Sequence, residues 1–396
     1  MKIAFLLRIW PVYGGGETVT VVLANELVKR GVEVEVIYFH DTPQGIALPD
    51  IDSRIKAIRI PDIKLNEYSK DLFVNKDDAR NADNTLEEIV RRDKIDILHN
   101  QWWPIEYYQN TRRNTHVKVV TVLHMQPDLR REFDFKGIKG KVFKMIEPVY
   151  RKFEEEKNLY RSDRYYKGSD KYVFLADPFM DYYRKKRHLP NDDAKTGFIY
   201  NPSTFRSYSD EEQLKEDTKE MLMVGRLVED HKKVLRLLRS WQLAEKKGLQ
   251  GWHLTIVGDG PDKNRYEEFV KGEGITDVFF EGFQAPLEYY KRAAIFGMTS
   301  AYEGFCMTLV EAMQNGCVPI VMDTFAACHV IIRNDYNGLL VPDDDIQAFS
   351  NAIIELATNQ EKRIRLKKNG LISCRDFSVE KIAGQWIELY NKLMSE

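Results

Sequence analysis

The sequence predicts an α/β protein with two doubly wound, Rossmann-like domains that face each other across a cleft. The chain has 396 residues, which is longer than the roughly 250 to 300 residues beyond which a single core seldom grows. Short apolar runs, typical of buried parallel strands, alternate with helical patterns twice along the chain. A polar, acidic stretch between the two series, Ser207 to Asp217, is typical of a linker.

The overall composition is that of a globular protein without a strong charge. Hydrophobic residues make up 43% of the chain, and 59 basic residues face 61 acidic ones, so no general attraction to nucleic acid is expected. The four cysteines show no zinc-ligand spacing and are interpreted as reduced thiols of a cytoplasmic protein. The first apolar run, Ile3 to Leu7, is too short for a signal peptide, and no transmembrane segment is expected.

The first half begins with a buried strand over Lys2 to Leu7 and a helix over Glu17 to Lys29 that ends at Gly31. The glycine triplet 14–16 between them would let a ligand approach the backbone closely. A dinucleotide fingerprint would need glycine where Val19 stands, so NAD is not expected. We interpret the turn as helping to hold a sugar or a phosphate.

Two later strands of the first half each close on a histidine. Lys94 to Asn100 contains His99, which is either a structural residue or a site residue, and Val117 to His124 ends on His124. His124 is the stronger site candidate, because the turn that follows leaves it at a strand exit. The remaining expected segments are a second strand at 32–39, a polar surface excursion from Pro61 to Asn84, a helical region from Phe135 to Arg164, and strands at 172–176 and 197–202.

The second half repeats the alternation of strands and helices. Strands are expected at 221–225, 253–258, 277–282, 294–300 and 318–322, with helices at 233–246 and 263–271 and only helices after the last strand. The run of three aspartates at 343–345 is interpreted as the cap of a helix that starts near Ile346, and not as a metal site.

The segment 301–316 carries two carboxylates, Glu303 and Glu311. Thr308 and Glu311 have the T-x-x-E form of a capping box, which predicts Thr308 as the cap of a helix. The free N–H groups at the start of such a helix are suited to a phosphate. Two alternatives remain: Glu311 is only a capping residue, and Glu303 is only a solvated turn residue.

Two cations, Arg226 and Lys232, follow the first strand of the second half. Arg can bind a diphosphate bidentately and Lys binds it as a point charge, so together they suit a diphosphate group. The alternative is that both are solvated surface charges. The neighbouring loop, Gly258 to Pro261, supplies permissive backbone at the next strand exit.

Taken together, the motifs GGGE, TVLH, NP, GRL with a following Lys, VGDGP, EGF and E-x7-E resemble those of the group-one family of retaining glycosyltransferases with the GT-B fold. The resemblance covers nearly the whole chain. Its closing stretch, Phe377 to Leu393, is similar to the family's final helix, which crosses back to the first domain. The resemblance therefore implies an acceptor-side domain of residues 1–203 with 377–396, and a donor-binding domain of residues 204–376.

The resemblance also implies roles for individual residues. Arg226 and Lys232 would bind the diphosphate, Glu303 the donor sugar, and His124 would lie near that sugar, so these four are the catalytic candidates. Glu311 would hold the ribose and Phe283 would lie beside the base. The further donor-binding candidates are Gly15, Gly16, Gly258, Gly304, Phe305, Cys306, Met307, Thr308 and Leu309.

The chain departs from the family pattern at two places. Lys233 stands where the family often has Gly, and Asn100 and Gln101 follow His99 where a second His is common. These departures concern the details of the acceptor side more than the donor site.

The implied activity is the transfer of a hexosyl unit from a nucleotide-sugar, UDP-sugar rather than GDP-mannose, to a glycan or lipid-linked acceptor in cell-surface polysaccharide or lipopolysaccharide biosynthesis. The alternative is a nucleotide-sugar epimerase or hydrolase on the same fold. No cofactor or metal is expected, because cations and a helix terminus can stabilise the leaving group.

The basic segment 129–152 is the candidate for membrane contact. It holds eight basic and three acidic residues with aromatic residues among them, so it could rest on an anionic membrane surface at the cytoplasmic face. The alternative is a solvated helix that packs a few aromatic side chains on the first domain.

Overall fold

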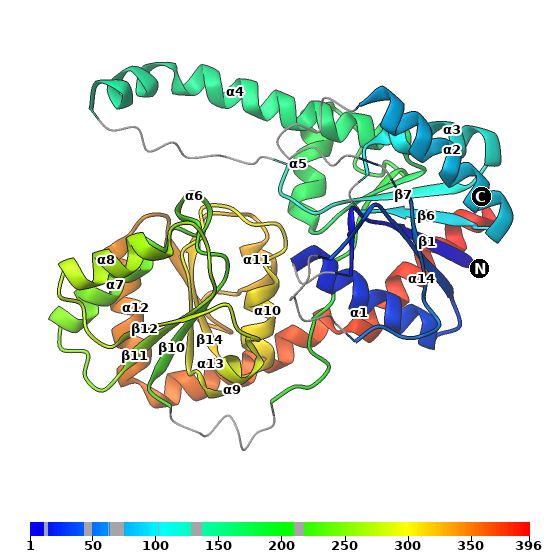
Figure 1. Ribbon diagram of the computed structural model, residues 1–396. Helices are drawn as coiled ribbons and strands as arrows, with labels where there is room; N and C mark the ends of the chain where they lie inside the picture. Colours follow the sequence, from blue (N-terminus) through cyan, green and yellow to red (C-terminus); the bar gives the residue numbers. More distant parts are fainter. Residues whose placement is uncertain are drawn as a thin grey trace. The chain divides into compact units, whose positions relative to one another are not determined.

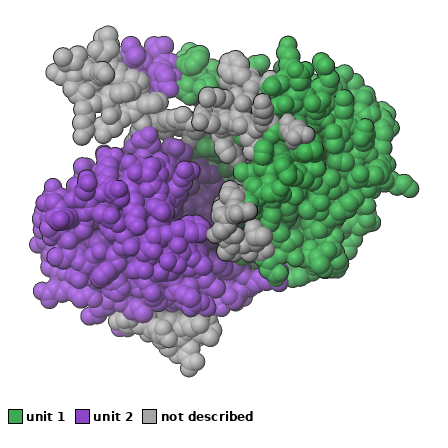
Figure 2. Space-filling model, viewed as in Figure 1, with its two compact units in different colours: residues 1–128, 152–204, 378–396 green, residues 129–151, 205–377 purple. Residues whose placement is uncertain are grey.

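The computed structural model describes residues 1–11, 15–42, 50–61, 63, 75–101, 103–127, 137–209 and 218–396, with side chains described for all of these except 15–17 and 137–145. The chain forms two compact units, shown in green and purple in Figure 2. Unit 1 contains residues 1–128, 152–204 and 378–396, and unit 2 contains residues 129–151 and 205–377. The predicted linker lies partly outside the described residues, at 210–217.

Unit 1 is built on a seven-stranded parallel sheet with the order β5-β3-β1-β6-β7-β8-β9. The central strands are covered on both faces, which explains their continuous apolar runs. The strands are β1 (Lys2–Leu6), β3 (Glu33–Tyr38), β5 (Lys56–Arg59), β6 (Ile97–Asn100), β7 (Lys118–Leu123), β8 (Lys171–Phe174) and β9 (Thr196–Phe198), and a separate two-stranded ribbon joins β2 (Ile9–Trp10) to β4 (His40–Asp41).

The helices of unit 1 pack in two groups, α1 with α14 and α2 with α3 (Figure 1). Helix α4 begins among the residues of unit 2 and continues into unit 1. The helices are α1 (Gly15–Lys29), α2 (Lys76–Asp93), α3 (Gln109–Thr115), α4 (Gly137–Gly168), α5 (Asp177–Arg187) and α14 (Val379–Ser395), with a short 3₁₀ turn η2 at Ile105–Tyr107.

Helix α2 corrects the predicted surface excursion from Pro61 to Asn84. Asn75 caps the helix by accepting hydrogen bonds from the N–H groups of Asp77 and Asp78, so the last nine residues of the expected excursion are helical. Most residues on the buried face of α2 are small or are flanked by charged residues, so the helical periodicity is hard to see in the sequence. The buried residues are Ala79, Ala82, Asp83, Leu86, Ile89 and Val90.

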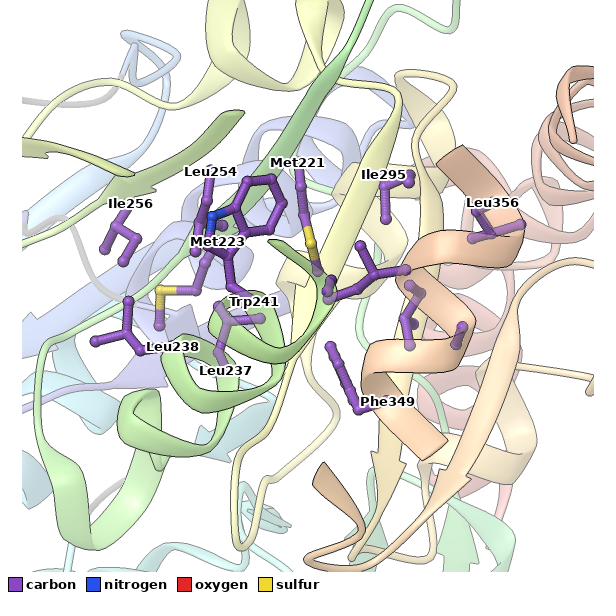
Figure 3. Packing of buried hydrophobic residues seen from close by; sticks show 14 of the residues in the cluster. Met221, Met223, Leu237, Leu238, Trp241, Leu254, Ile256, Ile295, Phe349 and Leu356 are labelled. Carbon is purple, nitrogen blue, oxygen red and sulfur yellow. The ribbon is translucent and has the colours of Figure 1, made fainter. Parts of the chain in front are cut away.

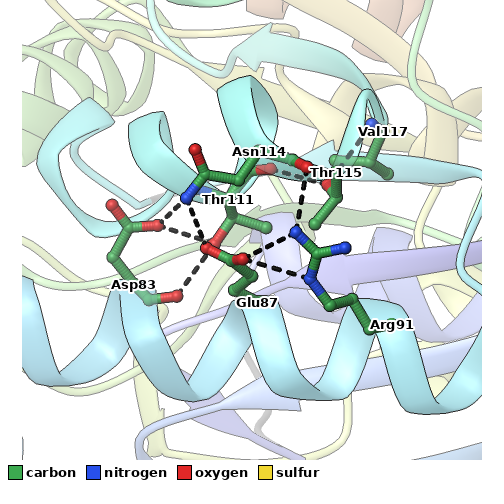
Figure 4. A network of polar contacts seen from close by, with 7 residues as sticks. All are labelled: Asp83, Glu87, Arg91, Thr111, Asn114, Thr115 and Val117. Atoms are coloured by element: carbon green, nitrogen blue, oxygen red, sulfur yellow. Dashed lines mark hydrogen bonds and ion pairs between the residues drawn. The ribbon is translucent and has the colours of Figure 1, made fainter.

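A polar network fixes α2 against α3 (Figure 4). The buried Asp83 carboxylate accepts hydrogen bonds from the backbone N–H groups of Asn110 and Thr111, both at 2.9 Å. Glu87 accepts from Asn114 Nδ2 at 2.7 Å and from Arg91 on its own helix at 2.8 Å. The first N–H groups of α3 are thus satisfied by a carboxylate from its neighbour.

Unit 2 is built on a six-stranded parallel sheet with the order β12-β11-β10-β13-β14-β15. Helix α7 packs against α12 and α8, and α10 packs with α13 (Figure 1). The strands are β10 (Glu220–Val224), β11 (His253–Val257), β12 (Val278–Gly282), β13 (Ile295–Met298), β14 (Val318–Asp323) and β15 (Leu339–Pro342). The helices are α6 (Glu229–Lys232), α7 (Val234–Lys246), α8 (Lys263–Gly272), α9 (Leu287–Arg292), α10 (Met307–Gln314), α11 (Cys328–Ile331), α12 (Ile346–Thr358) and α13 (Gln360–Cys374). A 3₁₀ turn, η4 (Arg375–Phe377), follows α13. Strand β15 corrects the expectation that only helices follow residue 322.

The core of unit 2 lies between the sheet and α7 and α12 (Figure 3). Trp241 of α7 is fully buried and lies among Met221, Leu254 and Leu238. Phe349 of α12 is also fully buried and belongs to the same hydrophobic cluster. Burying an aromatic side chain of this size contributes roughly 2 to 3 kcal/mol. This core fixes the strands whose carboxyl ends carry the candidate site.

Strand order places a topological switch point in each sheet, which confirms the predicted doubly wound class. In unit 2 the chain runs from β10 outward through β11 and β12 and then returns to pair β13 with the other side of β10. In unit 1 it runs from β1 outward through β3 and β5 and returns at β6. Ligands bind beyond the carboxyl ends of the strands at such points.

Candidate active site

The switch point of unit 2 carries an ion pair between Lys232 and Glu303. Lys232 ends the short helix α6 after β10, and Glu303 lies in the loop after β13. Lys232 Nζ lies 2.6 Å from Glu303 Oε1, and the two side chains are 12% and 10% exposed. The structure therefore brings together two predicted site residues that are 71 positions apart.

Two hydrogen bonds to backbone carbonyl groups hold these two loops together. Thr299 Oγ1 donates to the carbonyl oxygen of Lys233 at 3.0 Å, and the N–H of Ala301 donates to the carbonyl oxygen of His231 at 2.8 Å. The ion pair is thus positioned by the sheet and not only by its own attraction.

The charges of the pair support each other. Burial alone would raise the pKa of Glu303, but the positive charge of Lys232, with a smaller contribution from His231, lowers the pKa below its ordinary value. Burial lowers the pKa of Lys232, but the Glu303 carboxylate outweighs it, so the pKa is raised. Both groups are therefore charged at neutral pH.

His231 and Tyr302 are neighbours of this pair that the sequence pattern did not single out. Their rings stack with centroids 4.4 Å apart and planes 12° apart. His231 Nε2 lies 3.6 Å from the second carboxylate oxygen of Glu303. Each residue directly precedes a predicted site residue in the chain, which is the only signal that could have found them.

Arg226 occupies a different environment from Lys232. Its side chain is exposed and makes no hydrogen bond or ion pair with any other residue that the structure describes. The sequence predicts two cations at one strand exit. In the structure, one of them, Lys232, is paired with Glu303, and the other, Arg226, is exposed.

The glycine loop after β11 packs tightly on the loop after β10. A Cβ atom at Gly258, whose φ is +146°, would lie 1.9 Å from the carbonyl oxygen of Gly225. A Cβ atom at Gly260 would lie 2.3 Å from the carbonyl oxygen of Leu227. Glycine is required at both places because two backbones meet there.

Helix α10 corrects the predicted capping box. It begins at Met307, and its N-cap is Cys306, which has a φ of +59° and makes no side-chain capping bond. Thr308 lies inside the first turn, where its hydroxyl group is 3.5 Å from the Cys306 thiol. Because the helix starts one residue before Thr308, the threonine cannot act as the cap.

Glu311 is bound by a tyrosine from the preceding helix. Its side chain is 9% exposed, and its Oε2 accepts a hydrogen bond from the hydroxyl group of Tyr290 at 3.0 Å. Burial, followed by the negative charge of Glu311, raises the pKa of Tyr290 well above its ordinary value. Glu311 is therefore a buried, oriented carboxylate and not the partner of a helix cap.

The other predicted donor-binding residues of unit 2 divide by burial. The side chains of Phe305, Cys306, Met307 and Leu309 are buried, and Phe305 packs on Phe377 with ring centroids 5.2 Å apart. Gly304 is half-buried, and Phe283, after β12, is 70% exposed. At the start of α10 the groups that can reach a ligand are therefore backbone N–H groups.

In unit 1, Gly15 and Gly16 are the first two residues of α1, so the helix begins two residues earlier than expected. Gly14, the first glycine of the triplet, lies outside the described residues. The backbone N–H groups of Gly15 and Gly16 belong to a helix N-terminus, which favours negative groups.

His99 and His124 are linked through Gln101 at the carboxyl edge of this sheet. His99 is fully buried, and its Nδ1 lies 2.5 Å from the hydroxyl group of Tyr390 in α14. Gln101 Nε2 lies 3.2 Å from His99 Nε2, and Gln101 Oε1 is hydrogen-bonded to His124 Nε2. Burial lowers the pKa of each histidine to about 3, so both are neutral at physiological pH.

One group of described residues has the composition of a metal site. Asp323, Cys328 and His329 offer ligand atoms that lie within 4.8 Å of one another, and His329 Nε2 is 2.8 Å from Asp323 Oδ1. Burial, then the charge of Asp323, raises the pKa of the Cys328 thiol to about 12. The thiol is therefore protonated at neutral pH, and the contact between His329 and Asp323 is the hydrogen bond that characterises this cluster.

The aspartate run at 343–345 supplies a helix cap, as predicted. Asp345 caps α12 by accepting a hydrogen bond from the N–H of Ala348 at 2.8 Å.

Two family models match the chain, and together they cover most of its length. The model of "Glycosyl transferases group 1" matches residues 204–371, and the model of "Glycosyltransferase Family 4" matches residues 13–202. The helices that the structure describes include none with the length and hydropathy needed to cross a bilayer.

Relatives in sequence and in structure agree with these matches. Over 393 residues the chain is 24% identical to the GalNAc-alpha-(1->4)-GalNAc-alpha-(1->3)-diNAcBac-PP-undecaprenol alpha-1,4-N-acetyl-D-galactosaminyltransferase of Campylobacter jejuni, with 98% of each chain covered. It is 30% identical over 173 residues to the amylovoran biosynthesis glycosyltransferase AmsD of Erwinia amylovora, a match that covers 43% of this chain and about half, 48%, of that relative. The structure of Anabaena Alr3699/HepE in complex with UDP superposes with a TM-score of 0.70 at 16% identity and covers 99% of this chain and all of that one.

Proposed function

Since the chain belongs to the group-1 glycosyltransferases with the GT-B fold, we propose that it transfers a hexosyl unit, with retention of configuration, from a nucleotide-sugar to a glycan or lipid-linked acceptor. A UDP-sugar is favoured over GDP-mannose, because the structural relative Alr3699/HepE was solved with UDP. The named relatives serve polysaccharide and lipid-linked glycan synthesis, and none supports the epimerase or hydrolase alternative.

The observation that carries this proposal is the buried Lys232–Glu303 pair at the switch point of unit 2. We assign Lys232 and Arg226 to the diphosphate and Glu303 to the hydroxyl groups of the donor sugar. Glu311, oriented by Tyr290, is assigned to the ribose. The first N–H groups of α10 are assigned to a phosphate oxygen.

Transfer breaks the bond between the anomeric carbon and the diphosphate oxygen and forms a bond from that carbon to an acceptor hydroxyl on the same face. The proton of the acceptor leaves with the diphosphate. Negative charge therefore grows on the leaving group, where Lys232, Arg226 and the start of α10 can stabilise it. Glu303 is not assigned as a covalent nucleophile, because one of its oxygens is already bound to Lys232.

The test is calorimetric titration of UDP and GDP into the protein with and without EDTA. UDP should bind more tightly than GDP, and EDTA should not change the affinity or the later transfer activity. Rescue of an EDTA-treated enzyme by magnesium or manganese would contradict a metal-independent leaving-group step.

Matched variants sharpen the assignment. Arg226→Ala removes an exposed cation, so stability should change by less than about 0.5 kcal/mol while UDP affinity falls. Arg265→Ala, an exposed arginine on α8, is the control and should bind UDP as the wild type does. Glu311→Gln keeps an acceptor for Tyr290 but loses the charge, so it should weaken donor use without lowering the melting temperature. Unchanged donor use in Glu311→Gln would refute its role.

Peripheral membrane contact through the segment 129–152, at the cytoplasmic face, is a second part of the proposal. Residues 129–136 lie outside the described part of the chain, and side chains are described only from Ile146 onward, where Ile146 and Val149 are 48% and 75% exposed. Binding to phosphatidylglycerol vesicles should weaken with salt, since exposed charges are screened over about 8 Å at physiological ionic strength. Equal sedimentation of the wild type and a Lys139, Lys141 and Lys144 to Glu variant would exclude this segment as the contact.

A further inference from the structure

The side chain of Gln101 connects the buried ring of His99 to the half-buried ring of His124 in unit 1. Its two amide atoms differ chemically, since the NH2 group only donates and the oxygen only accepts hydrogen bonds. Nε2 faces His99 Nε2 at 3.2 Å, and Oε1 is hydrogen-bonded to His124 Nε2. The ring nitrogen of His99 must therefore accept, and the ring nitrogen of His124 must carry the proton.

The far end of this chain of hydrogen bonds is anchored in α14. With Nε2 accepting, the proton of neutral His99 lies on Nδ1 and is donated to the hydroxyl group of Tyr390, 2.5 Å away. The His99 ring is held between Phe5 and Trp386, with centroids 4.6 Å and 4.5 Å away. Neither ring nor amide can turn without breaking a buried contact.

We propose that Gln101 is a positioning residue that holds His124 as the neutral tautomer protonated at Nε2, so that Nδ1 is the nitrogen able to accept a hydrogen bond from a substrate hydroxyl group. The proposal rests on the proposed function, in which His124 lies near the transferred sugar. It assigns Gln101, at a place where the family resemblance leads one to expect a second histidine, a role in the acceptor-side chemistry.

An amide suits this role because it does not titrate. A histidine at the same position could both donate and accept, and its polarity would change with pH. The titratable partners of this chain include His99 from β6 and Tyr390 from α14, and the rings of Phe5 and Trp386 that pack on His99 are uncharged. The burial that lowers the histidine pKa values keeps both rings neutral over the physiological range.

The direct test is the ¹⁵N NMR spectrum of the histidine rings in the full-length protein. His124 should show a protonated Nε2 and an unprotonated Nδ1 in the wild type, and a mixture of tautomers in Gln101→Leu. Gln126→Leu, which changes another buried glutamine two residues after His124, is the control and should keep the wild-type tautomer. A wild-type His124 protonated at Nδ1 would overturn the proposal, because the amide would then have the opposite orientation.

Kinetics separate positioning from a merely structural role. Gln101→Leu should lower kcat by about five- to tenfold, as expected for one lost orienting hydrogen bond, with little change in the donor KM. Gln101→Glu places a carboxylate beside His124 and should raise its pKa, so activity should acquire a new dependence on pH and recover as pH rises. An unchanged kcat in Gln101→Leu, together with an unchanged pH profile in Gln101→Glu, would refute the positioning role. A wild type without transferase activity would instead refute the proposed function, and the NMR result would still stand.

Discussion

At the scale of single residues, the Lys232–Glu303 pair determines both the charge and the stability of the candidate site. Removing one partner of a buried ion pair leaves an uncompensated charge, which costs about 3 to 5 kcal/mol. Lys232→Met should therefore lower the free energy of unfolding of unit 2 by about 3 kcal/mol, and Glu303→Gln added to it should recover part of the loss. Urea denaturation of the two variants measures both effects, and an additive loss in the double variant would contradict the pairing.

The same pair gives a pH dependence with a definite sign. Because the folded-state pKa of Glu303 lies below the ordinary value of 4.5, the pair stabilises the protein above pH 4.5 and loses that contribution as the pH falls further. The stability difference between wild type and Lys232→Met should thus be largest at pH 7 and smaller at pH 4. A difference that stays constant between these pH values would mean that Lys232 does not lower the pKa of the Glu303 carboxylate.

Motifs predicted which residues gather at the switch point but not how they pair. Spacing cannot show that Lys232 is bound to Glu303 while Arg226 stays in solvent, because those contacts depend on the parallel pairing of β10 with β13. The T-x-x-E pattern at Thr308 was misleading for a similar reason. The start of α10 is set by the left-handed Cys306, which local sequence did not reveal.

At the scale of elements, helix caps provide a paired comparison. Asp345 accepts from the N–H of Ala348 at the start of α12, whereas Thr308 makes no capping bond in α10. Asp345→Ala should cost about 1 kcal/mol of stability, and Thr308→Ala should cost less than about 0.5 kcal/mol. Thermal unfolding of the two variants checks the order, and equal losses would restore Thr308 as a cap.

The junction of α6 and α7 holds a residue in an unfavourable conformation. Lys233 has a φ of +51°, where a side chain costs roughly 1 to 2 kcal/mol and glycine costs little. Lys233→Gly should therefore be more stable than Lys233→Ala by about 1 kcal/mol, since both lose the side chain and only glycine relieves the backbone. Chemical denaturation decides this, and an alanine variant as stable as the glycine variant would exclude backbone strain.

Most strands were predictable, whereas elements without a clear apolar pattern were not. The apolar runs that form β1, β6, β7, β10, β11 and β14 are continuous because those strands are covered on both faces. Helix α2 was missed because alanines and a buried aspartate form much of its inner face. Strand β15 was missed because its four residues, Leu339–Pro342, follow a polar turn and are too few to show a period.

At the scale of the whole molecule, buried histidines should make unit 1 sensitive to acid. His99 has a folded-state pKa of about 3 against an ordinary value of 6.5, so its contribution to stability is complete above pH 6.5 and is lost as the pH falls toward 3. Within that window the loss is about 1.4 kcal/mol per pH unit for this one group.

Hydrogen exchange of the amides of β6 at pH 7.5, 6.5 and 5.5 measures this loss. The wild type should lose protection more steeply than His99→Asn, which has no group to protonate there. Parallel profiles for the two proteins would mean that His99 is not buried in its neutral form.

The division of the chain has a consequence for biosynthesis. The chain leaves unit 1 at residue 204 and returns to it only with residues 378–396. These last residues include Trp386 and Tyr390, which contact the ring of His99. A ribosome delivers residues 205–377 before that last segment, so unit 2 can reach its final structure on the nascent chain while unit 1 still lacks a helix. The half of the protein that is synthesised first is therefore the half that finishes folding last.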